Sequence, residues 1–307
     1  SPKIIPYENI SISPASSIFH YGQAVFEGMK AYKDKDDNVW LFRPEENYNR
    51  LNISLKRMCM PEVEKDLFFN GIKELLTIDR EWIGRGDTTL YIRPVVFATE
   101  PTIVASPSKE YKFYILCSPG SAYYFNPLSV LIEDTYIRAA KGGVGYAKAA
   151  GNYAGSFFPT SLALKKGFDQ IVWTDSENHK LIEEAGTMNI FFRINDKLIT
   201  PKHSDTILDG VTRKTVITVA KDIGIDIEER DIEVSEIIQE FENGNLIEVF
   251  GAGTAAVIAP IINFGYKEKK YTLNSVENQY GPIIKRKITD IQNNISEDIY
   301  NWRYQII

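Results

Sequence analysis

The segment Lys141-Gly-Gly-Val-Gly-Tyr-Ala-Lys148-Ala-Ala-Gly-Asn-Tyr153 is the most unusual stretch of the chain. Small residues surround Lys148, and small residues let the backbone approach another group closely. A lysine amine in such dry surroundings can lose its charge by desolvation and become a nucleophile, as a Schiff-base lysine must be. A flexible surface loop with a solvated lysine explains the same residues, so this segment alone leaves both interpretations open.

The composition of the whole chain is typical of a soluble globular protein. The 307 residues are 44% hydrophobic and 25% charged, and this length predicts about two domains. No apolar run approaches the ~20 residues of a membrane helix, and no signal peptide is visible. The net charge of −6 argues against a nucleic-acid partner, because phosphate binding needs a basic face.

Cysteine and histidine are scarce in the sequence. Cys59 and Cys117 lie in apolar contexts and are predicted to be buried free thiols, which indicates a reducing compartment and a cytoplasmic location. His20, His179 and His203 are scattered, so no metal-ligand spacing is present and no metal site is predicted. A zinc enzyme and a Cys–His protease are both disfavoured.

Strands outnumber helices in the predicted order of elements, without a regular βαβ alternation, which favours an α+β (mixed α/β) fold in two domains. The expected domains are residues 1–120 and 128–307, joined by a linker over 121–127. Pro94 predicts an edge or a bulge in its strand. Strands are expected at 24–32, 39–43, 90–98, 112–117, 170–174, 189–194, 197–200 and 246–250, and helices from Pro44 and at 67–78, 153–166 and 211–222.

A second glycine-rich stretch is Phe250-Gly-Ala-Gly-Thr254. A strand that ends in glycines can hold an anion on its backbone N–H groups. The stretch also matches a lax dinucleotide-binding pattern, but Pro260 follows too soon for the crossover helix that such a site needs. An anion cradle and a tight structural turn both remain open.

Several single residues carry candidate chemistry, each with an ordinary structural explanation beside it. Arg50 and Arg93 could bind phosphate or carboxylate in a fork, or lie solvated on the surface. Glu183 and Glu184 are adjacent in a strand, so one is expected to be buried and one exposed, unless both lie exposed at a strand end. Five aromatic residues could line a pocket or simply fill the core: Tyr21, Phe26, Tyr91, Tyr123 and Tyr153.

Taken in order, these segments resemble the branched-chain-amino-acid aminotransferases, a family of fold-type IV pyridoxal-phosphate enzymes. The match runs from about residue 4 to 290. Members usually carry some tens of residues before a segment like Ile4-Ile-Pro-Tyr7, and any substrate wall from that region is absent from this sequence. The matching motifs are His20-Tyr-Gly-Gln-Ala-Val-Phe-Glu-Gly-Met-Lys-Ala-Tyr32, Leu41-Phe-Arg-Pro44, Asn49-Arg50-Leu51-Asn52, Leu90-Tyr-Ile-Arg-Pro94, Ala147-Lys148-Ala-Ala-Gly-Asn-Tyr153, Glu184-Ala-Gly-Thr-Met-Asn189, Asp209-Gly-Val-Thr-Arg213 and Glu248-Val-Phe-Gly-Ala-Gly-Thr-Ala-Ala256.

The resemblance implies a fold and an activity. The fold would have a smaller N-terminal α/β domain and a larger C-terminal domain with a barrel-like sheet. The activity would be reversible transamination of L-leucine, L-isoleucine and L-valine with 2-oxoglutarate. The cofactor would be pyridoxal 5′-phosphate, held as an internal aldimine on Lys148, whose freed amine would then shuttle the substrate proton.

The resemblance also assigns the remaining site residues. Glu184, chosen over Glu183 by counting back from Asn189, would pair with the pyridine nitrogen. Tyr153 would bind the ring hydroxyl. The phosphate would be bound by Arg50, Val211, Thr212 and Thr254, and the substrate by Tyr21, Phe26, Tyr91, Arg93, Tyr123, Thr187, Thr254 and Ala255.

Arg93 gains a specific task from the dual specificity of the family. One pocket must accept an apolar side chain and then the γ-carboxylate of glutamate, and a rim arginine avoids burying that carboxylate unpaired. The resemblance further implies a homodimer. A D-amino-acid aminotransferase or an aminodeoxychorismate lyase would share Lys148 and Glu184, and a non-catalytic cofactor-binding protein is the alternative from another class.

Overall fold

The computed structural model describes residues 2–86, 88–120, 126–274 and 277–307. The chain forms two compact units: the first consists of Ser1–Ser121, Ala147–Tyr153 and Ile291–Ile307, and the second of Ala122–Tyr146 and Ala154–Asp290. The segment around Lys148 thus belongs by its contacts to the first unit. The division at a linker over 121–127 stays a prediction, and residues 121–125 of that linker lie outside the described ranges.

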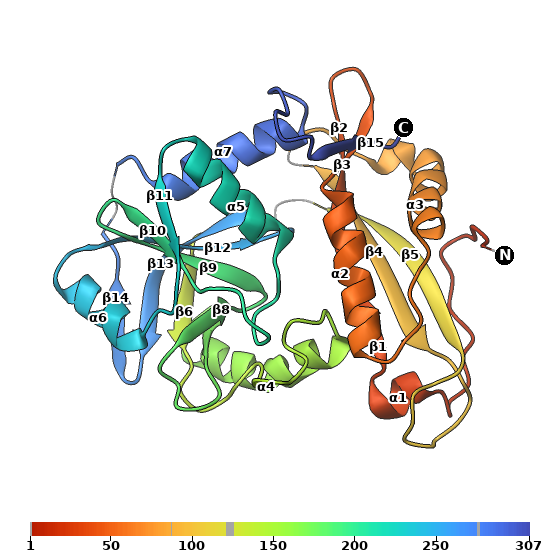
Figure 1. Ribbon diagram of the computed structural model, residues 1–307, viewed down its shortest axis with the longest axis horizontal. Helices are drawn as coiled ribbons and strands as arrows, with labels where there is room; N and C mark the ends of the chain where they lie inside the picture. Colours follow the sequence, from red (N-terminus) through yellow and green to blue (C-terminus); the bar gives the residue numbers. More distant parts are fainter. Residues whose placement is uncertain (1, 87, 121–125, 275–276) are drawn as a thin grey trace. The chain divides into compact units, whose positions relative to one another are not determined.

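The first unit is built on an antiparallel sheet with β4 (Thr89–Ala98) at its centre (Figure 1). β5 (Tyr111–Gly120) pairs with β4 along its whole length, and β1 and β2 share the opposite edge of β4. The outer strands follow through β3 to β15. Their bounds are β1 Ala24–Phe26, β2 Met29–Lys33, β3 Val39–Phe42 and β15 Arg303–Gln305.

The predicted strand over 24–32 is wrong as a single element, because it breaks at Glu27 and Gly28 into β1 and β2. Pro94 of β4 faces this break, and its carbonyl oxygen accepts a hydrogen bond from the Glu27 N–H at 2.8 Å. β4 is therefore not an edge strand. Because Pro94 has no N–H to donate, the sheet is interrupted beside it, at the break between β1 and β2.

Two helices, α2 (Pro44–Arg57) and α3 (Lys65–Ile78), bury apolar faces in the core of the first unit. Pro44 occupies the first turn of α2, where its missing N–H is harmless. Leu51 and Leu55 of α2 are fully buried in this core. The shorter helices are α1 (Ser17–Tyr21) and a 3₁₀ turn at Arg80–Trp82.

The second unit contains a closed six-stranded sheet, in which β8 pairs with both β7 and β9. The order around the barrel is β8, β9, β12, β13, β6 and β7, with β10, β11 and β14 as extensions. This confirms the mixed α/β class and the barrel-like sheet. The bounds are β6 Leu128–Ile132, β7 Gln170–Thr174, β8 Ile182–Ala185, β9 Met188–Ile194, β10 Lys197–Thr200, β11 Asp226–Glu229, β12 Leu246–Gly253, β13 Val257–Tyr266 and β14 Lys269–Thr272.

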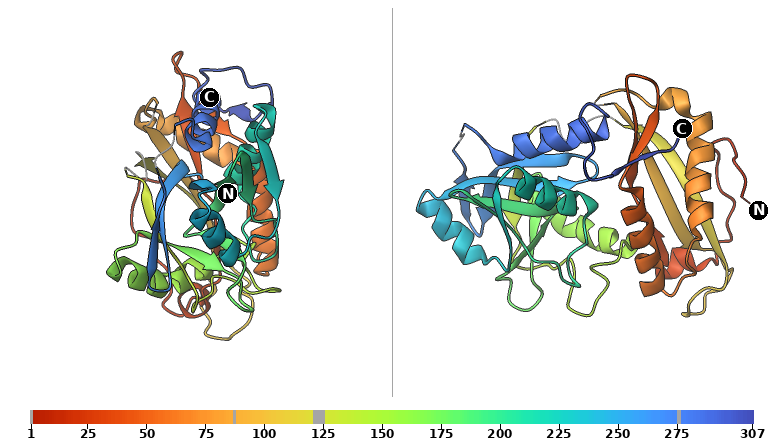
Figure 2. Two further views of the ribbon diagram at one scale, coloured as in Figure 1. Left: turned by 90° about the vertical axis from the view of Figure 1, so that its left-hand side faces the viewer. Right: turned by 45° about the horizontal axis from the view of Figure 1, so that its top comes forward.

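Helices cover the barrel, and α5 (Val211–Asp222) lies alongside β11 and β12 (Figure 2). The others are α4 (Ala150–Lys165), α6 (Val234–Glu242) and α7 (Tyr280–Gln292). Among the described helices, none has the length and apolar character required to span a membrane. Both cysteines are free thiols, as predicted, but neither is fully buried: Cys59 is exposed and Cys117 is half-buried.

Candidate active site

The backbone of Lys148 is fixed on both sides within the first unit. Its N–H donates to Ser54 Oγ of α2 at 2.8 Å, and its carbonyl accepts the N–H of Phe26 at 3.1 Å. The neighbouring Ala147 and Ala149 are each 1% exposed. Lys148 therefore belongs to a packed segment, which removes the interpretation as a flexible solvated loop.

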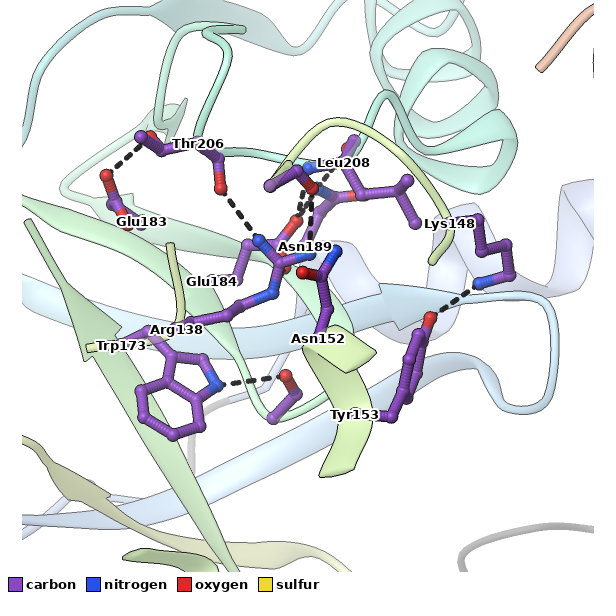
Figure 3. Close-up of polar contacts among 12 residues, drawn as sticks. Arg138, Lys148, Asn152, Tyr153, Trp173, Glu183, Glu184, Asn189, Thr206 and Leu208 are labelled. Carbon is purple, nitrogen blue, oxygen red and sulfur yellow. Dashed lines mark hydrogen bonds and ion pairs between the residues drawn. The ribbon is translucent and has the colours of Figure 1, made fainter. Parts of the chain in front are cut away.

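The amine of Lys148 lies beside two aromatic side chains, the phenol of Tyr153 and the ring of Phe26. Lys148 Nζ donates to Tyr153 Oη at 2.8 Å (Figure 3). Nζ lies 5.0 Å from the centre of the Phe26 ring, and that ring packs on Tyr153 with 4.8 Å between ring centres. The hydroxyl and the rings restrict where the amine can point, as a reacting amine requires.

Arg93 shares the same aromatic surface. Its guanidinium carbon lies 4.5 Å from the Phe26 ring centre, and Nη2 donates to Tyr91 Oη at 3.0 Å. Arg93 Nε is buried and has no hydrogen-bond partner among the described residues. A buried N–H without a partner indicates a place for a ligand atom or a water. Gly28 makes the arrangement possible, because a Cβ there would lie 1.9 Å from Tyr91 Oη.

Arg50 lies on α2 and forms a buried ion pair with Glu27. Nε and Nη2 contact the two carboxylate oxygens at 2.7 and 2.9 Å. The predicted substrate residue Tyr21 is exposed on α1, and its hydroxyl donates to the carbonyl of Ile103. Tyr123 lies outside the described residues.

In the second unit, Glu184 of β8 is buried and held by three donors. Arg138 Nε lies 2.8 Å from Oε2, while Oε1 accepts the N–H of Leu208 at 2.8 Å and Asn189 Nδ2 at 3.3 Å (Figure 3). Arg138 also donates to the carbonyls of Thr206 at 2.7 Å and Gly145 at 3.1 Å. The charge of Glu184 is thus compensated, and its carboxylate is fixed.

Glu183 differs from Glu184 in its surroundings, although both are buried. Their exposed fractions are 7% and 3%, so the prediction of one exposed carboxylate is wrong. Both faces of β8 are covered, because the strand belongs to a closed sheet. Burial raises the pKa of Glu183 to about 7 against the hydrogen bond from Thr206 Oγ1, and the charge of Glu184 adds to the rise. Glu184, with an arginine beside it, is the better ionised partner for a protonated ring nitrogen.

The amino end of α5 offers backbone N–H groups to an anion. Val211 and Thr212 begin the helix after Gly210, and no acidic residue occupies the first turn. A Cβ at position 210 would lie 1.9 Å from Asn189 Oδ1, so only glycine fits against the side chain that also contacts Glu184. The amino end of α5 and the carboxylate of Glu184 therefore both contact Asn189.

The turn between β12 and β13 carries Thr254 and Ala255. Ala252 pairs with Asn189, which puts this turn at the same barrel end as Thr187 between β8 and β9. Val257 follows with φ 60°, a conformation that β-branched residues rarely adopt, and Ile258 N–H donates across it to the Ala256 carbonyl at 2.8 Å. Such stored strain is typical of ligand-binding turns. No helix starts here, as the position of Pro260 implied.

Sequence reasoning assigned no role to four residues that organise these groups. Glu27, Ser54, Arg138 and Asn189 are each the partner of a predicted site residue. Glu27 carried a signal, because a charged residue stands within an apolar strand pattern. The other three carried none, since their roles depend on contacts between distant segments.

The comparisons with known proteins agree with this geometry. A family model described as amino-transferase class IV matches residues 24–264. The chain belongs to the class IV aminotransferases. A Staphylococcus aureus protein named probable branched-chain-amino-acid aminotransferase is 47% identical, over 98% of this chain and 86% of its own length. A Bacillus subtilis protein named branched-chain-amino-acid aminotransferase 2 is 43% identical, over 99% of this chain and 85% of its own.

A solved structure shows the same fold in a more distant relative. The branched-chain amino acid aminotransferase of Escherichia coli superposes with a TM-score of 0.85 at 24% identity, covering 99% of this chain and 97% of the other. The predicted family and the predicted fold are therefore confirmed, and the protein is an aminotransferase. The individual site residues remain predictions.

Proposed function

We propose that the protein transfers the amino group of L-leucine, L-isoleucine or L-valine reversibly to 2-oxoglutarate. The products are the branched-chain 2-oxo acid and L-glutamate. The names of the two relatives support this substrate class. The observation that carries the proposal is the contact of Lys148 Nζ with Tyr153 Oη at 2.8 Å, beside the aromatic surface that Arg93 shares.

The cofactor is pyridoxal 5′-phosphate, and the residues fit each of its groups. Lys148 offers an amine to the aldehyde, and Tyr153 a hydroxyl to the ring oxygen. The buried carboxylate of Glu184 suits a protonated ring nitrogen. In the first unit, the guanidinium of Arg50 suits a phosphate group. In the second unit, the N–H groups of the α5 amino end and Thr254 suit one as well.

When bound, pyridoxal phosphate supplies an electron-withdrawing ring that makes the α-proton of the amino acid acidic. The amine of Lys148 removes that proton from Cα as a general base. Tyr153 Oη, within hydrogen-bond distance of Nζ, orients the amine for this transfer. Glu184 keeps a proton on the ring nitrogen, and Arg138 keeps Glu184 charged and immobile.

Two kinds of side chain must enter one pocket in turn. The rings of Phe26 and Tyr91 offer apolar contact to leucine, isoleucine or valine. The guanidinium of Arg93 lies against both rings and binds the γ-carboxylate of glutamate. By the resemblance, Thr254 and Ala255 would present N–H groups to the α-carboxylate, and Tyr21, Tyr123 and Thr187 would contact the substrate.

We further propose that the protein is a cytoplasmic homodimer. The free thiols of Cys59 and Cys117 suit a reducing compartment. Phe157, Phe158 and Leu164 on α4 are between 56% and 68% exposed, more apolar surface than a helix of a monomer usually shows. Light scattering of the purified protein distinguishes a dimer from a monomer.

The experiment that tests the proposed activity is the visible absorption spectrum of the holoenzyme. L-leucine should bleach the band of the bound cofactor, and 2-oxoglutarate should restore it. A band that responds to D-alanine but not to L-leucine would keep the fold and overturn the substrate. If added pyridoxal phosphate gives no band at all, the assignment of Lys148 is wrong.

A further inference from the structure

Glu27 is a fully buried charge at the break between β1 and β2, and its side chain is 0% exposed. Burying a carboxylate costs free energy unless opposite charge and hydrogen bonds compensate it. The proposed reaction gives Glu27 no task, since no substrate or cofactor group is assigned to it. The side chain therefore needs an explanation of its own.

Four hydrogen bonds converge on the Glu27 carboxylate. Arg50 donates through Nε at 2.7 Å and Nη2 at 2.9 Å, Asn47 Nδ2 donates at 2.8 Å, and the N–H of Gly28 at 3.1 Å. Burial alone would raise the pKa of Glu27. The charge and hydrogen bonds of Arg50, the charge of Lys148 and the amide of Asn47 outweigh burial and hold the pKa below its usual value.

Two partners of Glu27, Asn47 and Arg50, lie on one buried face of α2, and Ser54 follows on the same face at helical spacing. Ser54 Oγ donates to the carbonyl of Arg50 at 2.9 Å and accepts the N–H of Lys148 at 2.8 Å. On the strand side, Phe26 directly precedes Glu27 and binds the Lys148 carbonyl. The carboxylate of Glu27 is thus attached to the same rigid frame that holds Lys148.

We propose that Glu27 is a positioning residue, which fixes the guanidinium of Arg50 in one orientation for the phosphate of the cofactor. The inference rests on the proposed function, in which Arg50 binds that phosphate. A bidentate carboxylate holds a guanidinium in a single plane, whereas an unpaired arginine side chain samples many rotamers. Glu27 also supplies the counter-charge of the buried Arg50 whenever no phosphate is bound.

The test compares two probes, pyridoxal 5′-phosphate and pyridoxal, which differ only in the phosphate. The ratio of their dissociation constants for the full-length apoenzyme isolates the phosphate contacts, because any bond to Lys148 is common to both. E27Q keeps the shape of the side chain but turns an N–H₂ group toward donors. It should lower the preference for pyridoxal phosphate by about tenfold, as expected for one lost charge-assisted hydrogen bond.

Three variants separate orientation from general damage. E27D keeps the charge and should restore part of the preference, and N47A, which loosens only one contact of the carboxylate, should lower it less than E27Q. E45Q is the matched control and should leave the ratio unchanged, because Glu45 lies on the same helix as Arg50 but forms an exposed ion pair with Lys65 of α3.

The outcomes distinguish this inference from the proposed function. If R50Q lowers the ratio while E27Q leaves it unchanged or raises it, Glu27 does not position Arg50 and only the inference falls. A rise would mean that Glu27 merely repels the phosphate. Equal losses for both probes in E27Q would indicate a purely structural role and also overturn it. If R50Q itself leaves the ratio unchanged, the phosphate role of Arg50 in the proposed function fails first.

Discussion

Replacing Arg93 with methionine should separate the two substrates of the proposed reaction. Methionine keeps an unbranched apolar side chain against the rings of Phe26 and Tyr91, so the aromatic surface stays filled. Only the guanidinium is lost. Its Nε, buried and without a partner in the described part of the chain, is a donor that a substrate carboxylate would satisfy.

The expected magnitude follows from the donors that the guanidinium offers. One charge-assisted hydrogen bond contributes about 1.5–3 kcal/mol when its partner is removed. Arg93 is half-buried, and its Nη2 already donates to Tyr91 Oη at 3.0 Å, so fewer donors are free for the substrate. We therefore expect Arg93→Met to lose about 3 kcal/mol of transition-state stabilisation for glutamate rather than twice that value. This corresponds to a loss of about 150-fold in kcat/KM for glutamate. For leucine, which has no γ-carboxylate, the change should stay within about threefold.

The assay measures kcat/KM for L-glutamate and for L-leucine in single half-reactions, so that neither substrate limits the other. Tyr91→Phe is the matched variant, because it removes the hydroxyl that holds Nη2 of Arg93. It should lower kcat/KM for glutamate selectively, but by less than Arg93→Met does. Equal losses for glutamate and leucine in Arg93→Met would refute the role of Arg93. A selective loss for leucine would reverse the assignment.

Three further predictions test other parts of the structure. Lys148→Ala removes the reacting amine and should abolish turnover with every amino acid, and measurable steady-state turnover would contradict the assignment. Native Glu183, with its pKa raised from 4.5 to about 7, keeps a proton that the unfolded chain loses, so the free energy of unfolding should fall as pH rises through this window. After solvent screening, this fall amounts to about 1–2 kcal/mol between about pH 5 and about pH 8, and Glu183→Gln should remove it. Urea titrations at the two pH values measure the free energy of unfolding, and the same pH dependence in the variant and the original protein would refute the prediction. Arg138→Gln leaves the buried Glu184 carboxylate without its counter-charge and should cost about 3–5 kcal/mol of stability. Adding Glu184→Gln should recover much of this loss, and strictly additive effects would argue against coupling.

Local chemistry made several elements predictable from the sequence. The helix over Val211–Asp222 and the strand over Gln170–Thr174 have the predicted bounds, because a helical apolar period and a short apolar run with turn residues beyond them leave few alternatives. The hairpin at Asn195 formed where Asn-Asp was expected, with φ 51° at Asn195. In each case residues adjacent in sequence decide the structure.

Elements that depend on distant segments were mispredicted for a physical reason. The interruption of the strand at Glu27 follows from the pairing of β1 and β2 with a neighbour that contains Pro94. The burial of both Glu183 and Glu184 follows from closure of the barrel, which covers both faces of β8. Neither the pairing nor the closure is encoded in a local pattern, so alternation along one strand gave the wrong exposure.

Arg50 and Glu184, two of the charged residues assigned to the cofactor, illustrate what a single sequence leaves hidden. Arg50 pairs with Glu27, and Glu184 pairs with Arg138, each in a buried position with a contact of 2.7 or 2.8 Å. A charge placed where water is excluded must be compensated before the ligand arrives, or the empty site would be unstable. The sequence motifs single out the residue that is proposed to face the ligand, because its type follows from the chemistry. The compensating residue only has to carry the opposite charge and lie within reach. Its identity therefore depends on which segments the fold brings together, and in both pairs these segments are 20 or more positions apart in the sequence.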